Sequence, residues 1–313
     1  MEKRKLGKSG IEFAPIAFGG NVFGWTADEA TSHKLLDAFV DAGFSFIDTA
    51  DVYSRWKPGN KGGESETVIG SWLKKNPAKR DKVLIATKCG MDMPNVGQGL
   101  SAAHIKRSVE DSLKRLNTDR IDLFQSHRDD KTTPQEETLA TYGELVKAGK
   151  LRFIGFTGHK DPQIHLAMLA EAERHGFEFD TVQMPLNVMD AHFNSFEAHV
   201  LPVLLQKRIG VLGMKSMGSG DILDSKVVKP AECLRYALSL PTSVVICGMD
   251  SDRVLDENLQ TVRSFSALSS AERSALLART LDAAQNGKHE LFKTSHKYDG
   301  TIQNPKWLEQ AAL

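Results

Sequence analysis

The sequence has few cysteines, no excess of either charge and no long apolar run. Its 313 residues include three cysteines, Cys89, Cys233 and Cys247, without a CxxC pair, so we expect three reduced, mostly buried thiols. Lys+Arg and Asp+Glu each number 40, which gives no argument for a nucleic-acid or membrane partner. No stretch approaches the ~18 apolar residues that span a bilayer, and no apolar segment follows the charged N-terminus, so we expect a cytoplasmic protein.

A glycine-rich dinucleotide fingerprint is also missing. No GxGxxG motif follows a predicted strand, and the nearest glycine-rich stretch, at residues 213–220 (GMKSMGSG), has a different spacing. This argues against a Rossmann domain. No metal ligands are assigned.

What the sequence does contain is a regular alternation of strand and helix patterns. After a predicted hairpin at residues 3–13, eight short apolar runs have the composition of strands that are buried on both faces. They are residues 16–19, 45–48, 82–88, 121–127, 153–157, 181–184, 211–215 and 244–248. Helical periodicity or capping signals mark residues 28–42, 102–116, 134–148, a helix opened by Asp161-Pro162, 252–265 and 270–284.

Eight such units predict one α/β domain, a (β/α)₈ TIM barrel. We assign the hairpin to residues 3–13, the barrel to 15–265, and a C-terminal helix and tail to 266–313, with the part of the tail from residue 286 expected to be irregular.

Three of these strand ends, with a tyrosine just past the first, carry one set of chemical groups. Asp48, Lys88 and His127 close their runs, and Tyr53 follows Asp48 by five residues. The carboxyl ends of the strands form the working face of such barrels. A phenol keeps its proton at neutral pH, a nearby ammonium stabilises its phenolate, and an imidazole N–H can bind an oxygen that gains negative charge. Each residue alone is better explained as a turn, surface or packing residue, but together they predict a proton-donating site for carbonyl reduction.

Three segments resemble the aldo-keto reductase family. They are GFSFIDTADVY at residues 43–53, ATK at 86–88 and IDLFQSH at 121–127, and the likeness extends from the hairpin to Glu257-Asn258. The resemblance implies that Tyr53 is the general acid, that Asp48 and Lys88 tune it, and that His127 orients the substrate.

The resemblance also implies a nicotinamide coenzyme bound on the barrel itself, and we place NADP(H) ahead of NAD(H). The residues it implies for the coenzyme are Gly20, Asn21, Asp48, Thr157, Gly158, Gln183, Met214, Lys215, Ser216, Gly218, Gly248, Met249, Asp250, Arg253, Glu257 and Asn258. Three departures from the family pattern are Thr157-Gly158 in place of Ser-Asn, Met214 in place of a stacking aromatic residue, and Val254 where many NADP-preferring members have a basic residue.

On the substrate side, the loop aromatics Phe23, Trp25 and Trp56, with His159, are the candidate wall of the pocket. Such a wall favours aryl or medium-chain aldehydes over sugars. The loop at residues 54–63 is polar and glycine-rich, which predicts a partial lid. We expect a monomer or a weak homo-oligomer.

Two alternatives remain open from the sequence. The first is a coenzyme-binding regulatory subunit with slow or vestigial chemistry, because residues up to about 150 resemble potassium-channel β-subunits as well as bacterial reductases. The second is a recombined or engineered barrel with impaired activity, because residues from Phe156 onward resemble a different bacterial subgroup.

Overall fold

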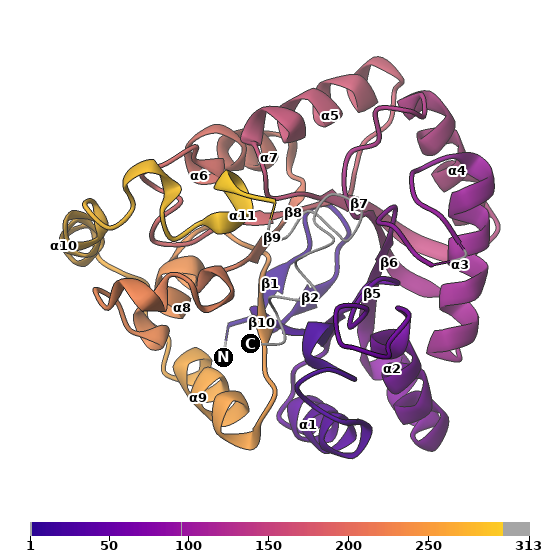
Figure 1. Cartoon of the computed structure of the whole chain (residues 1–313), viewed down its shortest axis with the longest axis horizontal. Helices are drawn as coiled ribbons and strands as arrows, with labels where there is room; N and C mark the ends of the chain where they lie inside the picture. The colour runs from indigo at the N-terminus through magenta and orange to yellow at the C-terminus, as the bar shows by residue number, and fades with distance from the viewer. Residues whose placement is uncertain (1, 95, 297–313) are drawn as a thin grey trace.

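The computed structural model describes residues 2–94 and 96–296, and these form a closed barrel of eight parallel strands inside a ring of helices (Figure 1). The barrel strands are β3 (Ile16–Gly19), β4 (Phe46–Asp48), β5 (Leu84–Cys89), β6 (Ile121–Ser126), β7 (Leu151–Thr157), β8 (Thr181–Pro185), β9 (Gly210–Met214) and β10 (Val244–Gly248). Strands β3 to β10 pair in chain order, and β10 returns to pair with β3. The predicted (β/α)₈ TIM barrel is therefore confirmed.

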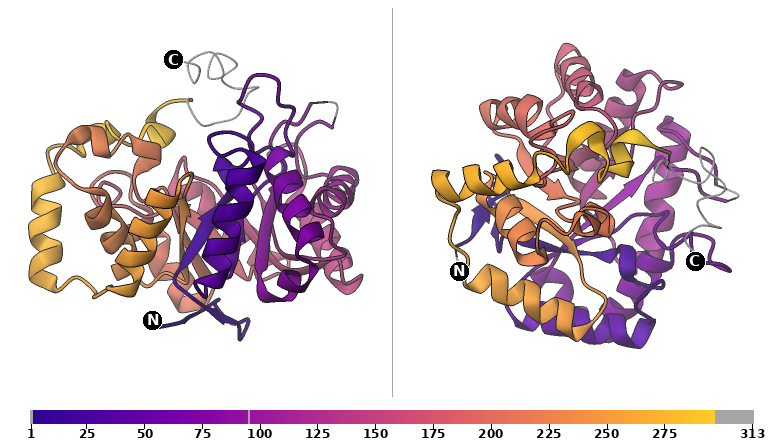
Figure 2. Two further views of the ribbon diagram at one scale, coloured as in Figure 1. Left: turned by 90° about the horizontal axis from the view of Figure 1, so that it is seen from below. Right: turned by 60° about the vertical axis from the view of Figure 1, so that its left-hand side comes forward.

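The predicted hairpin closes the amino-terminal end of the barrel. Strands β1 (Arg4–Lys5) and β2 (Glu12–Phe13) pair antiparallel, and Figure 2 shows them at the opposite end of the barrel from α11. Leu6 and Phe13 pack onto the apolar side chains that fill the barrel interior, and the ring of Phe13 lies 5.1 Å from that of Phe46. The hairpin thus covers the floor of the barrel, which leaves the carboxyl ends of the strands as the open face.

Each strand is followed by helical structure on the outside of the barrel. The helices are α1 (Glu29–Asp41), α2 (Glu64–Lys75), α3 (Ala102–Leu116), α4 (Gln135–Lys147), α5 (Pro162–Arg174), α6 (Phe196–His199), α7 (Leu201–Lys207), α8 (Pro230–Ser239), α9 (Asp252–Arg263), α10 (Ser270–Thr280) and α11 (Leu291–Thr294). Helix α10 begins with a capping box, since Ser269 accepts from the amide of Glu272 while the Glu272 carboxylate accepts from the amide of Ser269. The predicted cap at Asp161 is present as well.

Two predictions about individual segments need adjustment. Helix α4 begins after Pro134, which itself occupies the N-cap position rather than the first turn. The tail that was expected to be irregular contains a short 3₁₀ helix at Gln285–Gly287 and then α11. The rest of the tail, with Tyr298 and Trp307, lies outside the described residues.

The burial of the three cysteines agrees with the expectation from composition. Cys89, Cys233 and Cys247 are buried free thiols. Within residues 2–94 and 96–296, no helix is both long and apolar enough to cross a membrane.

Candidate active site

Strand periodicity explains why Asp48 and Lys88 meet inside the barrel. Side chains two residues apart share a face of a strand, and Phe46 and Ala86 both fill the interior. Asp48 and Lys88 therefore point inward one layer higher, at the carboxyl end, where both are almost fully buried. The ammonium of Lys88 lies 2.7 and 2.8 Å from the two carboxylate oxygens of Asp48, and 2.7 Å from the carbonyl oxygen of Thr49.

The phenol of Tyr53 joins this pair. Its Oη lies 3.2 Å from Nζ of Lys88, and its ring centroid lies 5.7 Å from the imidazole of His127. Four side chains from three strand ends and one loop are thus brought together as the sequence predicted. The geometry provides a phenol in contact with a buried ion pair and an imidazole beside it.

Burial dominates the electrostatics of these four groups. It raises the pKa of Asp48 and lowers that of Lys88, and in each case the opposite charge of the partner opposes the shift. Burial and the charge of Asp48 raise the pKa of Tyr53 well above its usual value. The sequence predicts that Lys88 makes this phenol more acidic, but in the structure burial and the negative charge of Asp48 have the opposite effect. The phenol therefore keeps its proton at neutral pH.

The imidazole of His127 is held neutral. Burial lowers its pKa well below the usual value, and the positive charges of Lys88, His159, Lys215 and Arg128 lower it further. A neutral imidazole still carries one N–H donor, which can bind a carbonyl oxygen. The Nδ1 atom of His127 is buried without a hydrogen-bond partner among the described residues.

A second buried layer behind Lys88 was not found from the sequence. Glu66 is fully buried in α2 and accepts hydrogen bonds from the hydroxyl of Thr87 (2.6 Å) and from Nε of Arg115 (2.7 Å). The nearby carboxyl of Asp51 is also buried, and burial together with the charge of Glu66 raises its pKa well above the usual value. Glu66 lies in a helix that no motif marked, and tertiary packing, including that of α2 against α3, brings it to the site.

Residues predicted for the nicotinamide end of a coenzyme meet around the sulfur of Met214. The amide of Gln183 lies 3.3 Å from the sulfur of Met214 and accepts a hydrogen bond from Gln125 at 3.0 Å. The hydroxyl of Thr157 lies 4.0 Å from the same sulfur. The departure at Gly158 has a structural counterpart, because a Cβ atom there would stand 2.8 Å from Cε1 of His165. His165 was missed by the sequence argument, and its imidazole fills the space beside Gly158 that a side chain would need.

The remaining coenzyme candidates lie around the mouths of β3, β9 and β10. Gly20 is packed tightly, because a Cβ atom there would stand 2.9 Å from the carbonyl oxygen of Asp48, and the side chain of Asn21 lies beside Gly248. Lys215 has a φ of 55° and places its ammonium 5.1 Å above the ring of Phe292. Arg253 and Glu257 form an exposed pair one helical turn apart in α9, at 2.8 Å. The other predicted contacts, Ser216, Gly218, Met249, Asp250 and Asn258, lie in these same segments.

The predicted aromatic wall is only partly available. Phe23 is wholly buried and packs on Phe18 in the core, so it cannot line a pocket. Trp56 contacts the ring of Tyr53 (5.8 Å between centroids) and that of Trp25 (5.5 Å), which makes a chain of aromatic rings that leads away from the phenol. Loop aromatics can turn toward the core or toward the site, and the sequence pattern did not distinguish the two.

A cavity of about 810 Å³ opens at His127. Its lining includes Thr157, Gly158, His159 and His165 on the β7 side, and residues 293–296 of the C-terminal segment. Two polar atoms in its wall, Nδ1 of His127 and Nδ1 of His165, are buried and have no hydrogen-bond partner within the described part of the chain. Unpaired buried polar atoms beside a cavity fit a ligand that carries amide and hydroxyl groups, as a nicotinamide nucleotide does.

Comparison with known proteins identifies the family. A model of the aldo/keto reductase family matches residues 15–232. The oxidoreductase YrpG of Bacillus subtilis (strain 168) is 34% identical over 236 residues, which cover 73% of this chain and 70% of YrpG. The aldo-keto reductase YhdN of the same organism is 36% identical over 227 residues, which cover 70% of this chain and 63% of YhdN. A probable voltage-gated potassium channel subunit beta of Oryza sativa subsp. japonica is 29% identical over 322 residues, which cover 100% of this chain and 93% of that protein.

The fold agrees with this assignment. The holo form of the aldo-keto reductase AKR11C1 from Bacillus halodurans superposes with a TM-score of 0.74 at 24% identity, covering 89% of this chain and 96% of that chain. At this identity the likeness supports the barrel architecture, while the family model and the Bacillus relatives support the family. The chain belongs to the aldo/keto reductase family and is an NAD(P)-dependent oxidoreductase.

Proposed function

We propose that the protein reduces an aldehyde or ketone to the alcohol, with Tyr53 as the proton donor. The observation that carries this proposal is the contact of the Tyr53 phenol with the buried Lys88–Asp48 pair, 5.7 Å from the ring of His127. When bound, the reduced nicotinamide would supply the hydride that adds to the carbonyl carbon. The residues of this chain handle the proton and the charge that develops on the oxygen.

Each of the four residues has a separate role in this proposal. The neutral imidazole of His127 donates its N–H to the carbonyl oxygen and orients it. The phenol of Tyr53 transfers its proton to that oxygen as negative charge builds up there. The resulting phenolate is stabilised by the ammonium of Lys88, 3.2 Å away, and Asp48 keeps Lys88 charged and in place. A proton from solvent then restores the phenol.

For the coenzyme, we propose NADP(H) ahead of NAD(H), held at the ends of β7 to β10. Gln183 and Thr157 are the partners proposed for the carboxamide, with Met214 packed on the nicotinamide ring and residues 215–218 along the pyrophosphate. Arg253 lies in the segment expected at the adenosine end and favours a 2′-phosphate there, while Asp250 opposes one. The aromatic chain of Trp56 and Trp25 beside Tyr53 supports an apolar carbonyl substrate, such as an aryl aldehyde.

Replacement of Tyr53 by Phe tests the proton donor. Tyr53→Phe removes the acid but keeps the ring, so turnover should fall by about 10²- to 10⁴-fold while the dissociation constant for NADPH stays within about twofold. Tyr142→Phe is the matched control. Tyr142 is also a buried phenol, but its hydroxyl shares a hydrogen bond with the hydroxyl of Ser126 and does not line the cavity. Turnover is followed as the loss of NADPH absorbance with aromatic aldehydes. Normal turnover in Tyr53→Phe would remove Tyr53 from this role.

A second candidate function is a coenzyme-loaded regulatory subunit with little turnover. It is favoured by the likeness to the Oryza channel subunit over the whole length of the chain. The same assay separates the two functions. Rapid NADPH consumption supports the reductase, whereas tight NADPH binding with negligible turnover across aldehydes and ketones supports the regulatory subunit.

A further inference from the structure

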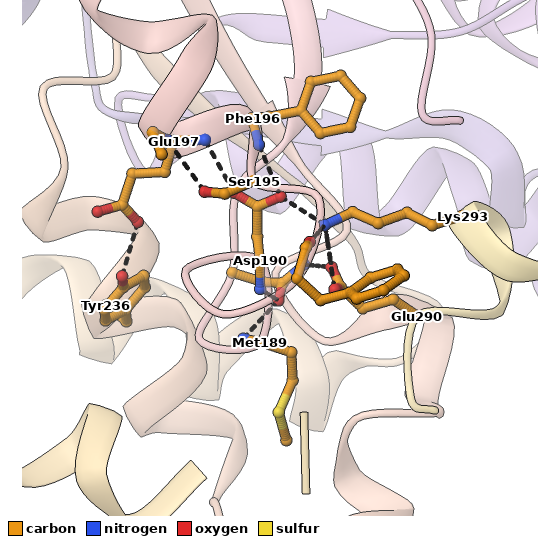
Figure 3. Close-up of polar contacts among 11 residues, drawn as sticks. Met189, Asp190, Ser195, Phe196, Glu197, Tyr236, Glu290 and Lys293 are labelled. Atoms are coloured by element: carbon orange, nitrogen blue, oxygen red, sulfur yellow. Dashed lines mark hydrogen bonds and ion pairs between the residues drawn. The ribbon is translucent and has the colours of Figure 1, made fainter. Parts of the chain in front are cut away.

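A second lysine, Lys293 of α11, has a buried side chain beside the cavity that opens at His127. Its ammonium lies 2.6 Å from a carboxylate oxygen of Asp190, 3.0 Å from a carboxylate oxygen of Glu290 and 2.8 Å from the carbonyl oxygen of Phe193 (Figure 3). The side chains of all three charged residues have no exposed surface. These contacts use all three donors of the ammonium, so Lys293 is held in one geometry.

The acidic partners connect two distant parts of the chain. Asp190 lies in the loop after β8, where its carboxylate accepts hydrogen bonds from the amides of Phe196 (3.0 Å) and Glu197 (2.9 Å) at the start of α6. Asn187 of the same loop donates to Glu290 at 3.1 Å. The cluster therefore links α11, which follows the barrel, to the loop after β8, the strand that carries Gln183.

The segment that Lys293 holds lines the cavity that opens at His127, the one of the four clustered residues that lines this cavity. Residues 293–296 line it together with His127. The ring of Phe292 lies 6.0 Å from the ring of His159 and 5.1 Å from the ammonium of Lys215, and Lys160 donates to the carbonyl oxygen of Ser295. A shift of α11 would therefore change the contacts that Phe292 makes with His159 and Lys215.

The cluster contains two carboxyl groups for one ammonium. Burial raises the pKa of Glu290 to about 7; Lys293 and Asn187 oppose this rise, and the negative charge of Asp190 adds to it. Burial raises the pKa of Asp190 as well. These are the charged and polar groups that act on Glu290 from α11 and from the loop after β8. Below about pH 7 Glu290 carries a proton and the cluster is neutral, whereas above it the cluster holds one excess negative charge without water.

We propose that Lys293 is a positioning residue which, by binding Asp190 and Glu290, fixes residues 293–296 as a wall of the cavity at His127, and that the ionisation of Glu290 sets how firmly this wall is held. The held state is favoured at acidic and neutral pH and weakens as Glu290 loses its proton. The effect on coenzyme binding rests on the proposed function, whereas the positioning of the wall does not.

Hydrogen exchange of the full-length protein tests the positioning. The amides of residues 292–295 are compared with those of α3 in the same molecule, at about pH 6 and about pH 8.5, after correction for intrinsic exchange. In the wild type, protection of residues 292–295 should fall about tenfold between these pH values while α3 changes little. Glu290→Gln should keep its protection at both, because the excess charge cannot form. Lys293→Met should lose protection at both, and Lys288→Met, an exposed neighbour, should match the wild type.

Coenzyme binding gives the second measurement. The dissociation constants of NADPH and NADH, from fluorescence quenching, should rise severalfold from about pH 6 to about pH 8.5 in the wild type and less in Glu290→Gln. A wild type whose protection at residues 292–295 does not change with pH, or a Glu290→Gln variant with the same slope, would overturn the proposal, even if Lys293→Met does not fold. Absence of coenzyme binding in every variant would count against the proposed function alone, because the exchange result still decides the role of Lys293.

Discussion

Two buried lysines, Lys88 in the barrel and Lys293 beyond it, show how charge balance decides what a buried cluster can do. Lys88 binds both oxygens of one carboxylate, Asp48, so one positive charge is in direct contact with one negative charge, and Glu66 and Asp51 lie in the layer behind. Lys293 binds two carboxylates, Asp190 and Glu290. The first arrangement suits a fixed electrostatic environment for the phenol, whereas the second contains a proton that titrates near neutral pH. Although both clusters are buried, the charge of the Lys88 cluster is expected to stay constant near neutral pH, whereas that of the Lys293 cluster changes with pH.

The largest effect is expected when either lysine is removed. Lys88→Met and Lys293→Met each leave a buried carboxylate without its counter-charge. Each substitution should therefore lower the unfolding free energy by about 3–5 kcal/mol. The two variants should differ in chemistry, because Lys88→Met loses turnover even where it is folded, while Lys293→Met keeps measurable turnover with weaker coenzyme binding. Urea denaturation followed by circular dichroism gives the stabilities. Lys288→Met should stay within about 0.5 kcal/mol of the wild type, and a similarly small loss in Lys293→Met would contradict the buried-cluster interpretation.

The next effect is a pH dependence of stability that belongs to Glu290. The pKa of Glu290 is raised from 4.5 to about 7 in the folded protein. Its contribution to the unfolding free energy is therefore fully present below pH 4.5 and is lost as the pH rises through about 7. The shift corresponds to about 3 kcal/mol at most. The unfolding free energy of Glu290→Gln should therefore fall less than that of the wild type between about pH 5.5 and pH 8.5.

Glu272 provides the matched control for this pH dependence. Hydrogen bonds from Ser269 and Arg235 lower its pKa to about 2, so it stays ionised over the whole range from about pH 5.5 to pH 8.5. Glu272→Gln should leave the slope of stability against pH unchanged. Parallel slopes in the wild type and Glu290→Gln would show that Glu290 does not titrate in this range.

The difference between the two clusters also explains what the sequence could predict. Asp48, Lys88 and His127 stand at the ends of apolar runs, and parallel strands in a barrel bring such ends together, so the convergence followed from the strand pattern alone. Asp190, Glu290 and Lys293 follow no periodic pattern. Their meeting depends on how residues 285–296 pack over the loop after β8, about 100 residues earlier in the chain, and no local signal carries that information.

Details inside the predicted site were harder to predict for the same reason. Phe23 was expected in the pocket wall but packs on Phe18, because the turn at Gly20–Val22 directs it into the core. The pKa of Tyr53 shifts upward instead of downward, because the phenol is buried and the negative charge of Asp48 lies close to it, and neither feature follows from the sequence pattern. Gly158 was recognised as a departure, but His165, which fills the space beside it, lies seven positions further along the chain and carries no motif.

The smallest effect on stability concerns an exposed pair, Arg253 and Glu257, in contrast to both buried clusters. The two side chains lie one turn apart on α9 and are more than half exposed, so Arg253→Ala should change the unfolding free energy by less than about 0.5 kcal/mol. If Arg253 contacts a 2′-phosphate, the variant should bind NADPH about tenfold more weakly, because a charge-assisted hydrogen bond is lost, while NADH binding stays the same. Lys34→Ala is the matched control, since Lys34 pairs with Asp252 at the start of the same helix and is also exposed. Equal effects of Arg253→Ala on the two coenzymes would mean that Arg253 acts only through the general charge of this surface, and the preference for NADP(H) would then lose its only basic candidate on α9 near the expected adenosine end.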